Sequence, residues 1–144
     1  MRTKTLSLIM AGGLLALGLS GCGDQKATDA KLAKGCEAAV KTVLDKEKYS
    51  RQLGSVKSSS FDMSEGFRLV KLAVTTKDKQ YETSADETFN CKFQVDTSFL
   101  GLSWKAYLVQ VKVDEDIYGS EGGQIYGDMN DQMNLDDAVQ DAMK

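Results

Sequence analysis

Thr88–Val95 (TFNCKFQV) is the stretch that decides the fold, because it alternates strictly between apolar and polar residues. One face carries Phe89, Cys91, Phe93 and Val95, and the other carries Asn90, Lys92 and Gln94. A period of two residues is typical of a β-strand with one face buried and one face in water. The sequence therefore predicts a half-buried strand, with Cys91 on its core side.

A second cysteine precedes this strand in a segment of helical periodicity, Ala27–Lys48. The apolar positions of that segment recur three and four residues apart: Leu32, Cys36, Ala39, Val40, Val43 and Leu44. This spacing places them on one face of a helix, and Thr28 or Asp29 is suited to cap its start. We therefore expect Cys36 on the buried face of an N-terminal helix.

Cys36 and Cys91 are predicted to form a disulfide, because a buried helix face and a buried strand face bring both thiols into one core. Closing so long a loop would stabilise the fold by about 4 kcal/mol, through the lower entropy of the unfolded chain. A redox-active or metal-binding pair would need closely spaced or exposed thiols, which this pattern does not favour. A structural disulfide is the prediction.

Three further segments have the composition of strands: Ser58–Met63, Phe67–Thr76 and Trp104–Val113. The last segment, Asn134–Lys144, has helical spacing, with Asn134 as its candidate cap. The predicted fold class is α+β. An N-terminal helix is disulfide-linked to an antiparallel sheet of about four strands, and a short C-terminal helix follows.

A small repeat lies between the last predicted strand and the C-terminal helix. Ile117-Tyr118-Gly119 recurs as Ile125-Tyr126-Gly127, with Gly122 and Gly123 between the two copies. Paired glycines between β-forming residues indicate either a hairpin or a glycine-rich loop.

The N-terminus has the pattern of an export signal. Arg2 and Lys4 give it a positive start, and the uncharged apolar run Leu6–Leu19 follows. That run is shorter than the roughly 20 apolar residues that span a bilayer, so export is favoured over a membrane anchor. A buried N-terminal helix is disfavoured because the run has no polar face.

Leu19-Ser20-Gly21-Cys22 closes the apolar run and resembles the lipobox of bacterial lipoproteins. The resemblance implies cleavage before Cys22, a diacylglycerol on the Cys22 sulfur and an acylated amino group, and several acyl chains hold a protein stably on a membrane. Residues 1–21 would then be the signal peptide, 22–27 a lipidated tether and 28–144 a single periplasmic domain. Export would also supply the oxidising compartment that a disulfide needs.

The resemblance also bears on location. In lipoproteins of enteric-type bacteria, an Asp directly after the lipidated cysteine retains the protein in the inner membrane, whereas this chain has Gly23 there. The periplasmic face of the outer membrane is therefore implied, with the inner membrane as the alternative. The Cys-bearing helix followed by TFNCKF is similar to small uncharacterised domains often found in bacterial lipoproteins, which bring no known site with them.

Charge is unevenly distributed along the chain. Residues 23–79 have a net charge of +4 and residues 80–144 a net charge of −9, counting Lys, Arg, Asp and Glu. Nucleic acid is disfavoured as a partner, because binding phosphates needs clustered cations. The acidic half is expected to be a solvated face, or else a surface for a positively charged partner.

The residues for common catalytic chemistry are missing from the sequence. The chain has no histidine, which removes Ser-His-Asp and Cys-His catalysis and the usual zinc and copper ligand sets. Asp128–Asp136 partly resembles a calcium loop, but Met133 stands where Gly is needed and Val139 where a bidentate Glu is needed. We expect no enzyme activity, no cofactor and no bound metal.

The remaining candidate site is a binding patch made of Tyr118, Tyr126, Asp114, Glu115 and Asp116. Tyrosines beside flexible glycines suit recognition, although both could instead pack under the C-terminal helix. The expected function is a lipid-anchored periplasmic binding or accessory protein of the cell envelope. It would be held to the membrane by its lipid and would contact another envelope protein. The alternative is a periplasmic inhibitor or exclusion-type lipoprotein that blocks an enzyme, toxin or phage receptor.

Overall fold

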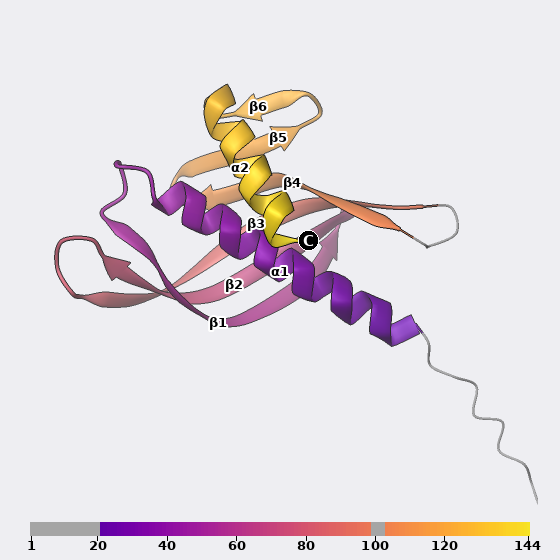
Figure 1. Ribbon diagram of the computed structural model, residues 1–144, viewed down its shortest axis with the longest axis horizontal. Helices are drawn as coiled ribbons and strands as arrows, with labels where there is room; N and C mark the ends of the chain where they lie inside the picture. The colour runs from indigo at the N-terminus through magenta and orange to yellow at the C-terminus, as the bar shows by residue number, and fades with distance from the viewer. Residues whose placement is uncertain (1–20, 99–102) are drawn as a thin grey trace, which may run out of the picture.

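The computed structural model describes residues 21–98 and 103–144, which form two helices and six strands in the order α1-β1-β2-β3-β4-β5-β6-α2 (Figure 1). The expected signal peptide lies outside the described residues apart from Gly21, as do Leu19 and Ser20 of the expected lipobox. None of the described helices is long and apolar enough to cross a membrane.

The N-terminal helix α1 spans Gly21–Leu44. It begins before Thr28 and Asp29, so neither residue is its cap. Residues 22–27, the expected tether, are part of the helix. Asp29 instead accepts two hydrogen bonds from Arg68, at 2.6 and 3.1 Å. The predicted buried face is confirmed, since Leu32, Cys36, Ala39, Val40, Val43 and Leu44 are all at most 1% exposed. The helix ends at Leu44, earlier than the predicted Lys48.

The sheet has six antiparallel strands rather than about four, and each strand pairs with its neighbours in the chain. The strands are β1 (Arg51–Ser64), β2 (Phe67–Asp78), β3 (Ser84–Thr97), β4 (Trp104–Val113), β5 (Asp116–Glu121) and β6 (Gln124–Tyr126). The four predicted strands correspond to β1–β4. The Ile-Tyr-Gly repeat supplies the other two, so the hairpin interpretation of that repeat is the correct one.

Glycines make the β5–β6 hairpin possible. Gly122 and Gly123 both have positive φ, 59° and 85°, which a tight two-residue hairpin turn requires. Gly119 has a φ of 129°, and a Cβ there would lie 2.3 Å from the carbonyl oxygen of Val109. Only glycine lets β5 approach β4 so closely at this point.

The C-terminal helix α2 spans Met129–Ala142. It begins earlier than Asn134, the predicted cap, which is an internal helical residue. The actual cap is Asp128, whose side chain accepts a hydrogen bond from the backbone N–H of Asn130 at 2.8 Å. Leu135 and Val139 of α2 are buried in the core.

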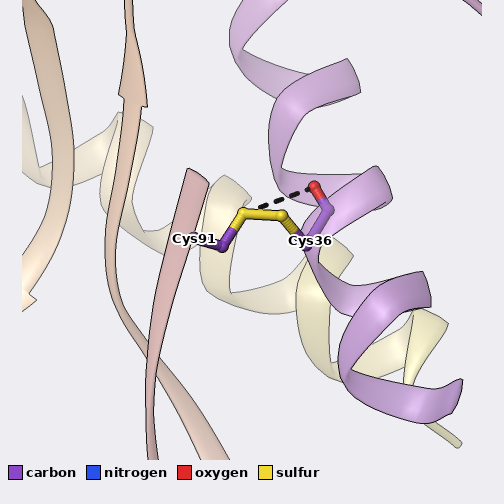
Figure 2. The surroundings of a disulfide bond; sticks show 2 residues. All are labelled: Cys36 and Cys91. Carbon is purple, nitrogen blue, oxygen red and sulfur yellow. Dashed lines mark hydrogen bonds between the residues drawn. A yellow bond between two sulfur atoms is a disulfide. The ribbon is translucent and has the colours of Figure 1, made fainter. Parts of the chain in front are cut away.

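Both helices pack on the same face of the sheet, as Figure 1 shows with α1 crossing the strands and α2 beside it. The disulfide between Cys36 of α1 and Cys91 of β3 is present, with 5.7 Å between the two Cα atoms (Figure 2). The dashed line in Figure 2 marks a 3.8 Å contact between Cys91 Sγ and the carbonyl oxygen of Cys36. The core therefore lies between the helices and one face of the sheet.

The opposite face of the sheet, which we call the outer face, is not covered by any described segment. On the central strands β2 and β3, residues of the core face are buried while their alternate neighbours are partly or fully exposed. Antiparallel sheets commonly have one such solvated face.

Candidate functional site

Tyr118 of the predicted patch is buried, with only 7% of its surface exposed. It belongs to the hydrophobic core cluster, which also contains Leu135 and Val139 of α2, so this tyrosine is part of the core and not of an exposed patch. Tyr126 is half-buried at the end of β6. The two tyrosines of the patch therefore do not form an exposed pair.

The hydroxyl of Tyr118 takes part in a hydrogen-bond network with Tyr49, which is itself buried. Tyr49 donates to Oδ2 of Asp116 at 2.8 Å, and the two tyrosine hydroxyl oxygens are 3.1 Å apart. Because Tyr49 donates its hydroxyl proton to Asp116, the hydroxyl of Tyr118 must donate to the hydroxyl oxygen of Tyr49. Lys48 Nζ lies 2.5 Å from the same Asp116 oxygen.

The ionisation of this network suits a structural role. Burial raises the pKa of Tyr49, and the hydrogen bonds with Tyr118 and Asp116 raise it further. The hydrogen bond from Lys48 lowers the pKa of Asp116, as does that from Tyr49. The tyrosine therefore stays neutral and the carboxylate stays ionised at neutral pH, so the ion pair with Lys48 and the hydrogen bond from Tyr49 are both kept.

Asp114 is engaged in a second network, around Arg51. Both terminal guanidinium nitrogens of Arg51 donate to Asp114, at 2.7 and 3.1 Å, and Arg51 Nε donates to Glu87 at 3.0 Å. Thr76 donates to the same Glu87 at 2.5 Å. These contacts join β1, β2 and β3 to the β4–β5 turn.

Glu115 is the member of the acidic cluster that is exposed and makes no ion pair or hydrogen bond with another described residue. Asp114 and Asp116 bind Arg51 and Lys48 instead. The cluster thus joins the start of β1 and the segment before it to the β4–β5 turn. Sequence reasoning missed Tyr49, Lys48 and Arg51, which follow α1 and show no periodic pattern of their own.

Cys22 lies in the first turn of α1, and Cys36 lies farther along the same helix. Asp128 and Asp136 of the calcium-like segment have structural partners, since Asp128 caps α2 and Asp136 accepts from Gln132 at 2.8 Å. In the part of the chain that the structure describes, no group of three or more His, Cys, Asp or Glu side chains is arranged to hold a metal.

The outer face contains a hollow of about 430 Å³ that crosses β1 to β4. Its outward-facing lining residues are Ser60, Asp62, Leu69, Lys71, Asn90, Lys92, Gln110 and Lys112. We call this hollow the outer trough. It combines lysine ammonium groups, side-chain amides and an apolar floor.

The register of the sheet places the trough lysines close together. Lys71 of β2 pairs with Asn90 of β3, and Asn90 pairs with Lys112 of β4. The two lysines are therefore two strand spacings apart, about 10 Å. In the next row, Lys92 pairs with Leu69 on one side and with Gln110 on the other.

Lys92 is the trough lysine that already has partners. Its Nζ lies 2.8 Å from Oε1 of Glu121 and 3.9 Å from the centre of the Phe67 ring. Lys71 and Lys112 are exposed and form no ion pair with any residue of the described ranges. Positive charge is therefore available at the middle of the trough.

The sequence contained a partial signal for this surface. Asn90 and Lys92 were predicted on the polar face of their strand, which is correct. What the sequence could not show is which residues of the neighbouring strands lie beside them, because register depends on pairing across the sheet.

Comparison with known proteins does not assign the chain to a family. No protein-family model matches it, and no match was found among curated proteins or solved structures.

Proposed function

We propose that this chain is a lipid-anchored, non-catalytic binding protein of the bacterial cell envelope, located on the periplasmic face of the outer membrane. The anchor part of the proposal is supported by the N-terminal pattern and by the lipobox-like Leu19-Ser20-Gly21-Cys22. A tether raises the effective concentration of a protein near its membrane neighbours, so a modest binding surface can be sufficient.

The observation that carries the binding role is the uncovered outer face. Both helices pack on the other side of the sheet, while the outer trough presents lysines and amides on three strands, β2 to β4. The acidic cluster first considered for binding makes contacts mainly within the chain, so the outer face is the better candidate surface.

The anchor is tested with Cys22→Ser in the native host. The wild-type protein should fractionate with membranes at the mass of a cleaved, acylated chain, whereas the variant should remain uncleaved and unacylated because the acceptor sulfur is gone. Cell fractionation and intact-mass measurement provide the readout. A cleaved, membrane-bound Cys22→Ser protein would refute lipid anchoring through this residue.

The binding role is tested by site-specific photo-cross-linking of the lipidated protein in its host. Benzoylphenylalanine replaces Tyr107, which is 47% exposed on β4, or Glu37, which is exposed on α1. We expect one abundant envelope protein to be captured from position 107 and little from position 37. Capture from neither position would contradict the binding role, and the identity of a captured partner would distinguish an adaptor from an inhibitor.

A further inference from the structure

We propose that the outer trough binds an acidic segment of a partner protein, whose carboxylates are held between Lys71 and Lys112. This inference rests on the proposed binding role and names the chemistry of the partner. Its basis is the sheet register, which places Lys71 and Lys112 on either side of Asn90. Neither lysine has an ion pair among the described residues.

Charge complementarity favours an acidic partner. Carboxylates form strong, charge-assisted hydrogen bonds with ammonium groups. Lys71 and Lys112 have no acidic partner within the described residues, whereas Lys92 is already neutralised by Glu121. The side-chain N–H groups of Asn90 and Gln110 add neutral donors between the lysines.

Apolar surface lies next to the trough lysines. Leu69 lies in the trough, and the Phe67 ring lies beneath the ammonium of Lys92. A protein segment can offer an apolar side chain next to its carboxylates and so use both kinds of surface. A purely ionic ligand would leave the apolar part unused.

The carboxylates at the trough favour a protein segment over a membrane as the partner. Asp62 lines the trough and Glu121 borders it at Lys92, so a broad anionic bilayer would meet these carboxylates as well as the lysines. A narrow acidic segment can enter between them. Small organic acids are disfavoured because Lys71, Asn90 and Lys112 are exposed, and small-ligand sites usually enclose most of the ligand.

The chemical test is carbodiimide coupling of the lipidated protein in envelopes of its own host. Carbodiimide activates a carboxylate, and a nearby lysine amine displaces the resulting urea to form an amide bond. We expect amide cross-links from Lys71 or Lys112 to Asp or Glu residues of one other protein, located by peptide mass spectrometry. Links found solely within this chain would overturn the proposal.

Substitutions separate charge from reactivity. Lys71→Arg/Lys112→Arg retains the positive charge but cannot be coupled, so it should lose the carbodiimide product and keep the photo-cross-link from position 107. Lys71→Gln/Lys112→Gln should lower that photo-cross-link about tenfold, which corresponds to about 1.4 kcal/mol of binding free energy. An unchanged yield in the glutamine variant would refute the role of the lysines.

The matched control is Lys34→Gln/Lys41→Gln, which removes the same charge from exposed positions on α1. It should retain the full photo-cross-link yield. A loss equal to that of the trough variant would mean that net charge, and not the trough, governs binding. Capture of a partner from position 37 alone would leave the binding role standing and overturn this inference, and lipid adducts alone at position 107 would assign the face to the membrane instead.

Discussion

Tyr49 is the residue whose environment differs most from what its sequence context suggests. It follows α1 in a polar stretch, yet its ring is buried and its hydroxyl contacts both Asp116 and Tyr118. A buried hydroxyl with two partners contributes to stability mainly because the partners would be left unsatisfied without it.

Tyr49→Phe should therefore lower the free energy of unfolding by about 1 kcal/mol. The ring still fills its place in the core, but Asp116 and Tyr118 each lose a hydrogen-bond partner. Chemical denaturation followed by circular dichroism measures the change. Tyr81→Phe is the matched control, because Tyr81 is 68% exposed and its hydroxyl makes no hydrogen bond within the described residues. Equal effects of the two variants would contradict a specific network.

Asp116 predicts a dependence of stability on pH. Its pKa is lowered, first by the hydrogen bond from Lys48 and then by that from Tyr49, so folding favours the ionised carboxylate. This contribution is complete above the unfolded pKa, about 3.9, and is lost as the pH falls through the lower folded value. Asp116→Asn should therefore melt below the wild type at pH 7 and converge with it toward pH 3.

Melting temperatures of the two proteins between pH 7 and pH 3 provide this measurement. Glu115→Gln is the neighbouring control, since Glu115 is exposed and has no partner among the described residues. Its melting curve should follow the wild type throughout the range. A difference between Asp116→Asn and the wild type that stays constant down to pH 3 would show that the carboxylate charge is not the cause.

Individual residues were predictable where periodicity determined burial. Cys36 and Cys91 were placed on buried faces from the spacing of their neighbours, and the structure confirms both the burial and the disulfide. The sequence does not decide whether Tyr118 is exposed or lies in the core, because a short glycine-rich repeat has too few residues to define a face.

At the scale of elements, the sequence placed four of the six strands and both helices but misjudged several ends. α2 is an example, because Asp128 and Asn134 are both good capping residues. The structure selects Asp128, which lengthens the helix and extends its packing against the rest of the molecule. Local preference alone does not choose between two competent caps.

Asp128→Ala should lower the free energy of unfolding by about 1 kcal/mol, because the N–H of Asn130 loses its side-chain acceptor. Asn134→Ala should have a much smaller effect or stabilise slightly, since alanine is the better residue inside a helix. Denaturant midpoints of the two variants provide the comparison. The reverse order of effects would place the helix start at Asn134.

The strands β5 and β6 were the elements hardest to predict. β6 has only three residues, and β5 contains Gly119, which ordinarily weakens a strand. Here the glycine is required by the close approach of Val109, a contact that exists only after β4 and β5 have paired. The β-propensity of its residues therefore does not predict β5, because pairing with β4 stabilises this strand.

At the scale of the whole molecule, the disulfide joins the helical layer to the sheet. It links Cys36 and Cys91 across 55 residues of chain, so it restricts the unfolded chain strongly. Cys36→Ala/Cys91→Ala should lower the free energy of unfolding by about 4 kcal/mol on the chain-entropy account. The loss of Cys36 and Cys91 packing adds to that figure.

Thermal melts with and without reductant check this prediction. Reductant should lower the melting temperature of the wild type and leave the double-alanine variant unchanged. A wild-type melt that does not respond to reductant, under conditions where free-thiol titration confirms reduction, would contradict a stabilising role for the bridge.

The sequence by itself determined the α+β class, the apolar and polar faces of Thr88–Val95, the buried face of α1 and the core positions of Cys36 and Cys91. These follow from periodicity, which states which side of an element avoids water. Tertiary structure decided that both helices pack on one side of the sheet, that Tyr118 enters the core, and that Lys71 and Lys112 flank Asn90. Those features depend on register and on the total surface buried when elements combine, and neither quantity is encoded in any single segment.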